Sequence, residues 1–233
     1  RNSCGNMAYQ DNQLQPDRGD MVTKLQFSPT DNHLLASCWD GSLALWNVLG
    51  SMPANYTFRH DSRKPVLDCA WSPDGVNAFY GGCDQKAYLW NLQTQQVEPI
   101  AQHNAPIKTV NPIPEISCVA TGGWDNCFNL WDLRQARGTL ASSAALPGKV
   151  YAADVKSMMI ILCLANRQVL LYDSRNMAQP YRIHNPELSY QLRSVACFPD
   201  MQGFVTGSVE GKCEVAYLQA ADQAKNFRFK RDR

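Results

Sequence analysis

Few residues in this chain are of types that could carry out acid–base or metal chemistry. The chain has four His, and His103 with Asp125 offers an imidazole and a carboxylate that could act in catalysis or hold a metal. The sequence has no Gly-x-Ser-x-Gly, no His-Glu-x-x-His, no phosphate-cradling glycine loop and no cluster of His and carboxylates at metal-ligand spacing. We therefore expect no catalytic residue, no cofactor and no metal.

Aromatic residues offer chemistry of another kind, the binding of a partner. Trp39 and Trp124 each stand directly before an Asp in a turn-like segment. A large aromatic on an exposed turn forgoes burial unless a partner supplies it. Both are candidate binding residues, although aromatics that only cover the edge of the fold would look the same in sequence.

Two phenylalanines alternate with basic residues in the run from Lys225 to Arg233. Rings can stack on bases while basic side chains neutralise phosphates, so the run predicts a contact with single-stranded RNA. A strand with both rings facing inward would show the same alternation. The candidate RNA contacts are Lys225, Arg228, Lys230 and Arg231.

The composition of the chain limits the partners and the cellular compartment that we expect for it. Lys and Arg total 22 against 21 Asp and Glu, so no chain-wide field favours duplex nucleic acid or an anionic membrane. Nine cysteines, an odd number without a Cys-x-x-Cys pair, lie mostly in apolar runs and indicate a reducing compartment. The longest apolar run, residues 158–165, is far shorter than the ~20 residues that cross a bilayer. We expect no membrane insertion.

The elements that position these residues repeat along the chain. In four segments an Asp or Asn precedes an aromatic residue by six positions, and a looser fifth copy runs from Glu210 to Tyr217. The aromatics lie 44, 41, 41 and 45 residues apart, which matches the ~40–45 residues of a four-stranded propeller blade. They are Trp46, Trp90, Trp131, Tyr172 and Tyr217.

A second strand signal precedes each aromatic. Alternating apolar residues begin at Val22, Val66, Ile107, Val150 and Ser194, and Ser-Pro, Pro-Asp or Asp-Gly closes several of the runs. Gly and Pro interrupt the chain too often for a sustained 3.6-residue period. The pattern predicts an all-β propeller with almost no helix and five legible blades.

These segments resemble the WD-repeat family. Trp131-Asp132 is the family's Trp-Asp dipeptide, and in Trp46-Asn47 and Trp90-Asn91 an Asn replaces the Asp. The resemblance implies a buried hydrogen-bonded network of His103, Thr121, Asp125 and Trp131, which is a structural role for the pair named above. It implies a second network of His60, Asp84 and Trp90, incomplete because Tyr80 occupies the hydroxyl place.

Longer stretches resemble one branch, the mRNA export factor of the nuclear pore and its relative, the spindle-checkpoint WD-repeat protein. They begin at Pro65, Ala101, Ser117 and Tyr190 and extend the resemblance over roughly residues 20–233. Ala101-Gln-His103 and Tyr151-Ala-Ala-Asp154 look more like the export factor, and Arg175-Asn-Met177 looks more like the checkpoint protein. The balance favours mRNA export.

The resemblance also implies a binding face. In a propeller the residue before each turn Asp points outward on one rim, and in this branch that rim grips an extended acidic peptide of a nucleoporin or a checkpoint kinase. The peptide-binding residues would be Trp39, Trp124, Arg193 and Lys212. Lys212 stands where the family has Arg, so a point charge replaces a bidentate fork and puts the strength of the carboxylate grip in doubt.

The function implied is a non-catalytic scaffold in the nucleus and at the nuclear envelope pore, exchanging with the cytoplasm. Alternatives are a checkpoint propeller that reads a kinase or a phosphorylated kinetochore peptide, and a propeller enzyme. Residues 21–233 would form the propeller, and residues 1–20 an N-terminal arm or a closing strand. Five blades are legible of a probable seven, so we expect a fragment that lacks the last two blades, or the ordered part of a longer chain, rather than a five-bladed ring.

Overall fold

The structure is a computed structural model that describes residues 14, 20–48, 55–62, 64–136 and 138–230. These residues form twenty strands and two short 3-10 helices. The prediction of an all-β propeller with almost no helix is confirmed. Of residues 1–20, which were expected to form an N-terminal arm or a closing strand, the structure describes Leu14 and Asp20, and Leu14 packs against Ala36, Ala44 and Trp46.

Each repeat is one antiparallel sheet of four strands in sequence order, here called blades 1 to 5. Blade 1 comprises β1 (Val22–Phe27), β2 (His33–Cys38), β3 (Ser42–Asn47) and β4 (Asn55–Asp61). Blade 2 comprises β5 (Val66–Trp71), β6 (Asn77–Gly82), β7 (Lys86–Asn91) and β8 (Val97–Gln102). Blade 3 comprises β9 (Ile107–Ile113), β10 (Cys118–Gly123), β11 (Cys127–Asp132) and β12 (Leu140–Ala145).

Blades 4 and 5 follow the same order. Blade 4 comprises β13 (Val150–Lys156), β14 (Met159–Leu164), β15 (Val169–Asp173) and β16 (Arg182–His184). Blade 5 comprises β17 (Leu192–Cys197), β18 (Gly203–Ser208), β19 (Lys212–Tyr217) and β20 (Phe227–Lys230). The 3-10 helices are η1 (Pro114–Ile116) and η2 (Ala220–Lys225).

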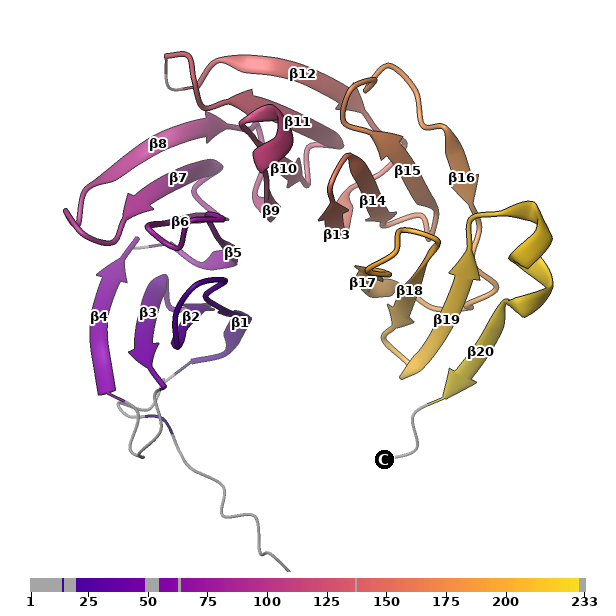
Figure 1. Cartoon of the computed structure of the whole chain (residues 1–233), viewed down its shortest axis with the longest axis horizontal. Coiled ribbons are helices and arrows are strands. Elements are labelled where there is room, and N and C mark those ends of the chain that lie inside the picture. The colour runs from indigo at the N-terminus through magenta and orange to yellow at the C-terminus, as the bar shows by residue number, and fades with distance from the viewer. Residues whose placement is uncertain (1–13, 15–19, 49–54, 63, 137, 231–233) are drawn as a thin grey trace, which may run out of the picture.

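The blades fan around a common axis (Figure 1). The first strand of each blade lies nearest the axis and the fourth lies at the rim, so β1, β5, β9, β13 and β17 line the inner side of the arc. The region that these strands face is called the channel below. The five blades form an open arc, with a gap between blade 1 and blade 5. All five inner strands have a register shift near their first residues, a β-bulge that re-aims the side chains there.

Apolar side chains between neighbouring blades hold the arc together. Leu35 and Leu43 of blade 1 pack with Val66 and Tyr80 of blade 2, and the other blade pairs have similar clusters. The repeated aromatics of blades 1 to 4 are all buried; they are Trp46, Trp90, Trp131 and Tyr172. Burial of a large aromatic contributes about 1.5–3 kcal/mol, which explains why each of the first four repeats has one at the same place.

The turn between the second and third strands has the same geometry in all five blades. Its third residue is left-handed, with φ between +62° and +90°, at Gly41, Gln85, Asn126, Arg167 and Gly211. In blades 1 to 4 an Asp or Asn side chain accepts a backbone N–H two residues ahead, as Asp125 Oδ1 does from Cys127 N at 3.2 Å. This is the reason for the Asp or Asn six positions before each aromatic.

Candidate functional site

One residue lies at the same place in every blade: the residue before the turn Asp, or before the Asn166 or Glu210 that replaces it in blades 4 and 5. Its N–H donates to the carbonyl of the residue just ahead of the inner strand, as Trp39 N does to Met21 O at 2.9 Å and Trp124 N to Pro106 O at 2.9 Å. Cys83, Ala165 and Val209 make the same bond in the other blades, to Pro65, Lys149 and Gln191. The five turns therefore gather on one face, beside the channel entrance. We call this surface the turn face.

The two tryptophans on the turn face differ in exposure. Trp39 is 41% exposed, while Trp124 is partly buried. The Trp124 Nε1 atom is buried and donates to no acceptor in the described part of the chain. A buried N–H without an acceptor costs free energy, so this indole favours a ligand or water that accepts its proton.

The structure places Arg193 and Lys212 in different surroundings. Arg193, the second residue of β17, is exposed at the channel entrance. Lys212, the first residue of β19, forms an ion pair with Glu210 (3.0 Å) and lines a groove of about 550 Å³ beside β20. Arg193 thus has a free approach from the channel, whereas the Lys212 ammonium already has a carboxylate partner.

A small cavity of about 160 Å³ opens where the inner strands meet at this entrance. Arg193 shares its lining with Lys24 of β1, Asp68 of β5 and Lys108 of β9. Lys24 Nζ lies 3.9 Å from Asp68 Oδ1, and Lys108 Nζ lies 3.4 Å from the carbonyl oxygen of Leu67. Sequence reasoning missed these three residues, because only the fold brings their strands together.

Burial shifts the pKa values of two charged side chains at this cavity, Asp68 and Lys108. Asp68 accepts the N–H of Val110 at 2.8 Å, yet its burial raises the carboxyl pKa above the ordinary value. Burial also lowers the pKa of Lys108; Asp68 opposes that shift, and the nearby Arg193 and Lys24 charges add to it. The cations here therefore repel one another around a single buried carboxylate.

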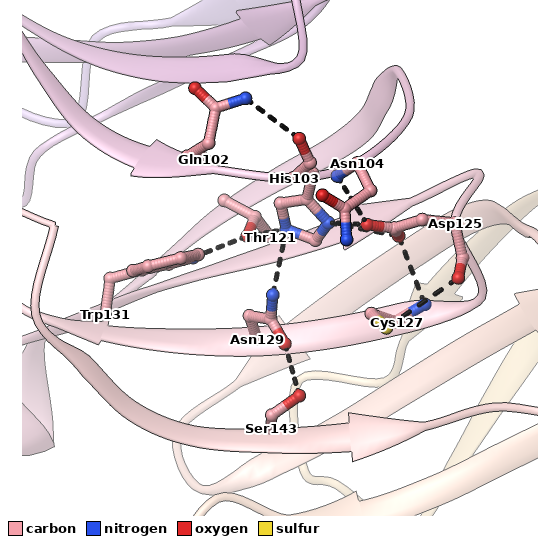
Figure 2. A network of polar contacts seen from close by, with 9 residues as sticks. All are labelled: Gln102, His103, Asn104, Thr121, Asp125, Cys127, Asn129, Trp131 and Ser143. Carbon is pink, nitrogen blue, oxygen red and sulfur yellow. Dashed lines mark hydrogen bonds and ion pairs between the residues drawn. The ribbon is translucent and has the colours of Figure 1, made fainter.

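The network around His103 joins blade 2 to blade 3 (Figure 2). Trp131 Nε1 donates to Thr121 Oγ1 at 2.7 Å, and Thr121 Oγ1 lies 2.7 Å from His103 Nε2. On its other side His103 Nδ1 lies 2.9 Å from Asp125 Oδ2. These contacts fit one neutral tautomer, in which Nδ1–H donates to the carboxylate and Nε2 accepts from the hydroxyl.

Further bonds close this network, and every polar group of the set has a partner. Asn129 and Ser143, which sequence reasoning missed, extend it: Ser143 Oγ donates to Asn129 Oδ1 at 2.6 Å, and Asn129 Nδ2 lies 3.4 Å from His103 Nε2. The His103 side chain is fully buried. A buried, fully engaged imidazole stabilises the fold and is poorly placed for catalysis.

Blade 2 satisfies its turn Asp differently. The Tyr88 hydroxyl donates to Asp84 Oδ2 at 2.7 Å, and the Tyr88 ring stacks on Tyr80 with ring centroids 5.0 Å apart. Trp90 is fully buried. The His60 side chain lies outside the described residues. Tyr88 occupies the position that Asn129 has in blade 3, a substitution that the sequence reading did not weigh.

Blades 4 and 5 are joined by a pair that sequence reasoning missed. His184 Nε2 lies 2.6 Å from Glu214 Oε1, and the N–H of Glu187 donates to Glu214 Oε2 at 2.9 Å. Both side chains are mostly buried. The sequence carried a signal for this pair, because a His-Asn dipeptide stands at the end of the outer strand at His184 and directly after it at His103.

Part of the C-terminal run forms the rim strand β20, in which both phenylalanine rings are exposed. Phe227 is 54% exposed and Phe229 46%, and their ring centroids lie 6.0 Å apart. Within the described residues, neither ring is buried in the core. Two of the candidate RNA contacts form ion pairs with carboxylates: Lys225 with Asp222 (2.7 Å) and Arg228 with Glu187 (2.8 Å). Arg231 lies outside the described residues.

Two absences hold for the described part of the chain. No group of three or more His, Cys, Asp and Glu side chains there could hold a metal ion. Within the same residues, no helix has the length and apolar character that crossing a membrane requires.

Comparison with known families and proteins identifies what this chain is similar to. The model of the WD domain, G-beta repeat, matches residues 12–47, 54–91 and 94–132, which are the first three repeats. Protein Rae1 of Drosophila melanogaster is 33% identical over 220 residues, covering 91% of this chain and 63% of that protein. The mRNA export factor of Xenopus tropicalis is 35% identical over 221 residues, and the match covers 91% of this chain and 60% of that protein.

A third relative extends the group to fungi. The Poly(A)+ RNA export protein of Schizosaccharomyces pombe is 29% identical over 214 residues, covering 91% of this chain and 60% of that protein. The chain spans about three-fifths of the length of the curated relatives it matches.

Proposed function

This chain is a WD40-repeat protein homologous to mRNA export factors, and from that premise we propose that it serves mRNA export as a non-catalytic scaffold. Its turn face holds an extended acidic peptide of a nucleoporin, at the nuclear pore. One observation carries the proposal: equivalent backbone bonds gather the five turn residues, two of them tryptophans, beside the exposed Arg193.

The parts of this face suit such a peptide. Trp39 offers an exposed ring that the apolar part of a peptide can cover, and the buried Trp124 N–H can donate to a peptide carbonyl. A charge-assisted hydrogen bond from Arg193 to an acidic side chain adds roughly 1.5–3 kcal/mol. Lys212 contributes less, because the peptide must compete with Glu210 for its ammonium group.

The checkpoint role is the competing proposal and uses the same face. The names of two of these relatives favour export, since they describe poly(A)+ RNA export and mRNA export. Pull-downs with an acidic nucleoporin peptide and with a phosphorylated kinetochore peptide separate the two. Export predicts retention of the nucleoporin peptide alone, and retention of only the phosphorylated peptide would contradict it.

A second candidate function is a contact with single-stranded RNA along β20. It is supported by the exposed rings of Phe227 and Phe229 and by a groove that Lys212, Arg228 and Lys230 line beside them. Filter binding of oligouridylate over a range of salt concentrations tests it. We expect affinity to fall as salt rises, since phosphate contacts release counterions, and a salt-independent titration would contradict the contact.

A further inference from the structure

A pocket of about 360 Å³ lies between blades 1 and 2, away from the turn face. Most of its lining comes from the connections between β1 and β2, between β5 and β6, and between β7 and β8. Because neighbouring strands are antiparallel, β2 begins at His33 beside this pocket and ends at Cys38, next to Trp39 of the turn face. The pocket, here called the blade 1–2 pocket, therefore opens on the opposite face of the arc.

The floor of the blade 1–2 pocket is apolar and already formed. Trp71, the last residue of β5, is 4% exposed and packs in one cluster with Leu45 of blade 1 and the partly buried Leu92. The Trp71 Nε1 atom donates to the Gln26 carbonyl across the blade boundary at 3.0 Å. Because this bond fixes the indole without a ligand, little ordering is left for binding to impose, which lowers its free-energy cost.

Two carboxylates stand at the edge of the pocket. Gly75 has a φ of +70°, and a Cβ at this position would overlap Thr30 Oγ1. The turn between β5 and β6 therefore lies directly against the connection between β1 and β2. Asp74 directly precedes this glycine and Asp31 directly follows this threonine, so both carboxylates lie near the same contact.

Neither carboxylate is neutralised by the protein. Asp31 and Asp74 form no ion pair within the described residues, and the described lining of the pocket contains no Lys or Arg. The Ser72 hydroxyl and the Val76 N–H both donate to Asp74 Oδ1 and hold the pKa of that carboxyl below its usual value. Two negative groups beside an apolar floor attract a cation that is carried on an apolar stem.

We infer that the blade 1–2 pocket is a docking site for an extended segment of a partner protein, which places an arginine side chain between Asp31 and Asp74 and an apolar residue over Trp71. The inference goes beyond the proposed function, because the segment binds on the face opposite the turn face. A planar guanidinium can donate to two carboxylates at once, whereas a lysine ammonium is a point charge. The scaffold then holds a partner on each face.

The lining disfavours other ligands. An RNA phosphate or an anionic lipid headgroup would bring negative charge to two carboxylates that no Lys or Arg of the described lining offsets. A metal ion is disfavoured because no group of three or more His, Cys, Asp and Glu among the described residues could hold one. A volume of about 360 Å³ is within the roughly 300–1,000 Å³ of ligand pockets and leaves room for an apolar residue beside the arginine.

Fluorescence anisotropy tests this site. The probes are fluorescein-labelled heptapeptides with arginine at the centre and leucine, isoleucine or phenylalanine on each side, titrated with the full chain. Asp74→Asn removes a charge and keeps the shape, so we expect it to weaken binding of the tightest probe about tenfold or more.

Asp200→Asn is the matched control. Asp200 is exposed in the corresponding Pro-Asp turn of blade 5, where it accepts the Gln202 N–H at 2.9 Å, and it lies outside the blade 1–2 pocket. Asp74 accepts the Val76 N–H in the same way at 3.0 Å, so the two substitutions disturb their turns equally. We expect the control to bind within about twofold of the unaltered chain.

Two further variants and a changed probe keep the test decisive. Asp31→Asn removes the second charge and Leu92→Ser removes part of the floor, and both should weaken binding. Citrulline in place of the probe's arginine keeps the shape without the charge and should bind about tenfold more weakly or worse. Failure of every probe to bind the unaltered chain, equal binding by the three pocket variants, or equal binding of the citrulline probe would each overturn the site.

Two other occupants are tested with the same variants. Sedimentation velocity should show the unaltered chain and Asp74→Lys as the same species, and a dimer that dissociates in Asp74→Lys would assign the pocket to a second copy and overturn the inference. An acidic nucleoporin peptide should bind Asp74→Asn as tightly as it binds the unaltered chain. A matching loss of both peptides in Asp74→Asn would contradict separate sites on the two faces and overturn the inference.

Discussion

His184 Nε2 lies 2.6 Å from Glu214 Oε1 and fastens blade 4 to blade 5, as His103 fastens blade 2 to blade 3 through Thr121 and Asp125. The two joints use different partners: His103 directly follows the rim strand β8, whereas His184 is the last residue of the rim strand β16. The arc is therefore stabilised by side-chain bonds between blades as well as by apolar packing.

Breaking the blade 4–5 joint should be costly. Because the pair is mostly buried, His184→Leu leaves the Glu214 carboxylate short of a partner, and we expect the free energy of unfolding to fall by about 3 kcal/mol. Urea titration measures the change. Adding Glu214→Met removes the orphaned charge, so the double variant should be more stable than His184→Leu alone; a double variant less stable than the single one would show that the pair is not the joint.

The hydroxyl of Thr121 is the centre of the blade 2–3 joint. Thr121→Val keeps the shape but leaves Trp131 Nε1 without its acceptor and removes the shorter of the two contacts of His103 Nε2, so we expect a loss of about 2–3 kcal/mol in the free energy of unfolding. Thr94→Val is the control, because Thr94 is exposed and donates only its backbone N–H to Asn91 Oδ1 at 2.8 Å. Equal losses in the two variants would count against the network.

Some features of this fold can be predicted from the sequence alone, and the two joints between blades show which ones. The repeats, the turn Asp positions and the strands beginning near Val22, Val66, Ile107 and Val150 could be predicted, because they are local patterns of turn residues and alternation. His103 and its partners came from the resemblance, since its bonds to Thr121 and Asp125 span 18 and 22 residues.

Other features needed the fold. Lys24, Asp68 and Lys108 lie in separate repeats, and no local pattern shows that the bulged inner strands turn them into one cavity. The rim strands were also hard to locate: β16 has only three residues, and β12 is mostly exposed, so neither shows a strand's alternation of burial. The prediction of two further blades stays a prediction.

The turn of blade 2 holds a strained residue. Gln85 has a φ of +69°, a left-handed conformation that costs a side chain roughly 1 kcal/mol and glycine very little. Gln85→Gly should therefore raise the free energy of unfolding by about 0.5–1 kcal/mol. Gln93→Gly, at an exposed position outside the left-handed region, should be neutral or destabilising, and thermal unfolding of both variants compares them. A loss of stability in Gln85→Gly would contradict the turn geometry.

Two buried cysteines should resist alkylation. Burial raises the pKa of the Cys69 and Cys163 thiols to about 12, so at pH 8 both remain protonated, and only the thiolate reacts. Iodoacetamide at pH 8 should leave both unmodified in the folded chain and should modify both in guanidinium, as peptide mass spectrometry can read. Among the cysteines that the structure describes, the partly exposed Cys213 should react first; modification of Cys163 at the same rate would mean that blade 4 opens.

The central claim is that the turn face binds an acidic peptide through its aromatic and basic residues. Titration calorimetry of a Trp39→Ala/Arg193→Glu double variant with an acidic nucleoporin peptide tests it most directly. Tyr181→Ala/Lys156→Glu is the matched control, since it removes an exposed ring and reverses a charge away from the turns. We predict that the first variant loses binding while its thermal unfolding and the control's affinity stay near those of the unaltered chain; undiminished affinity in the first variant would contradict the account.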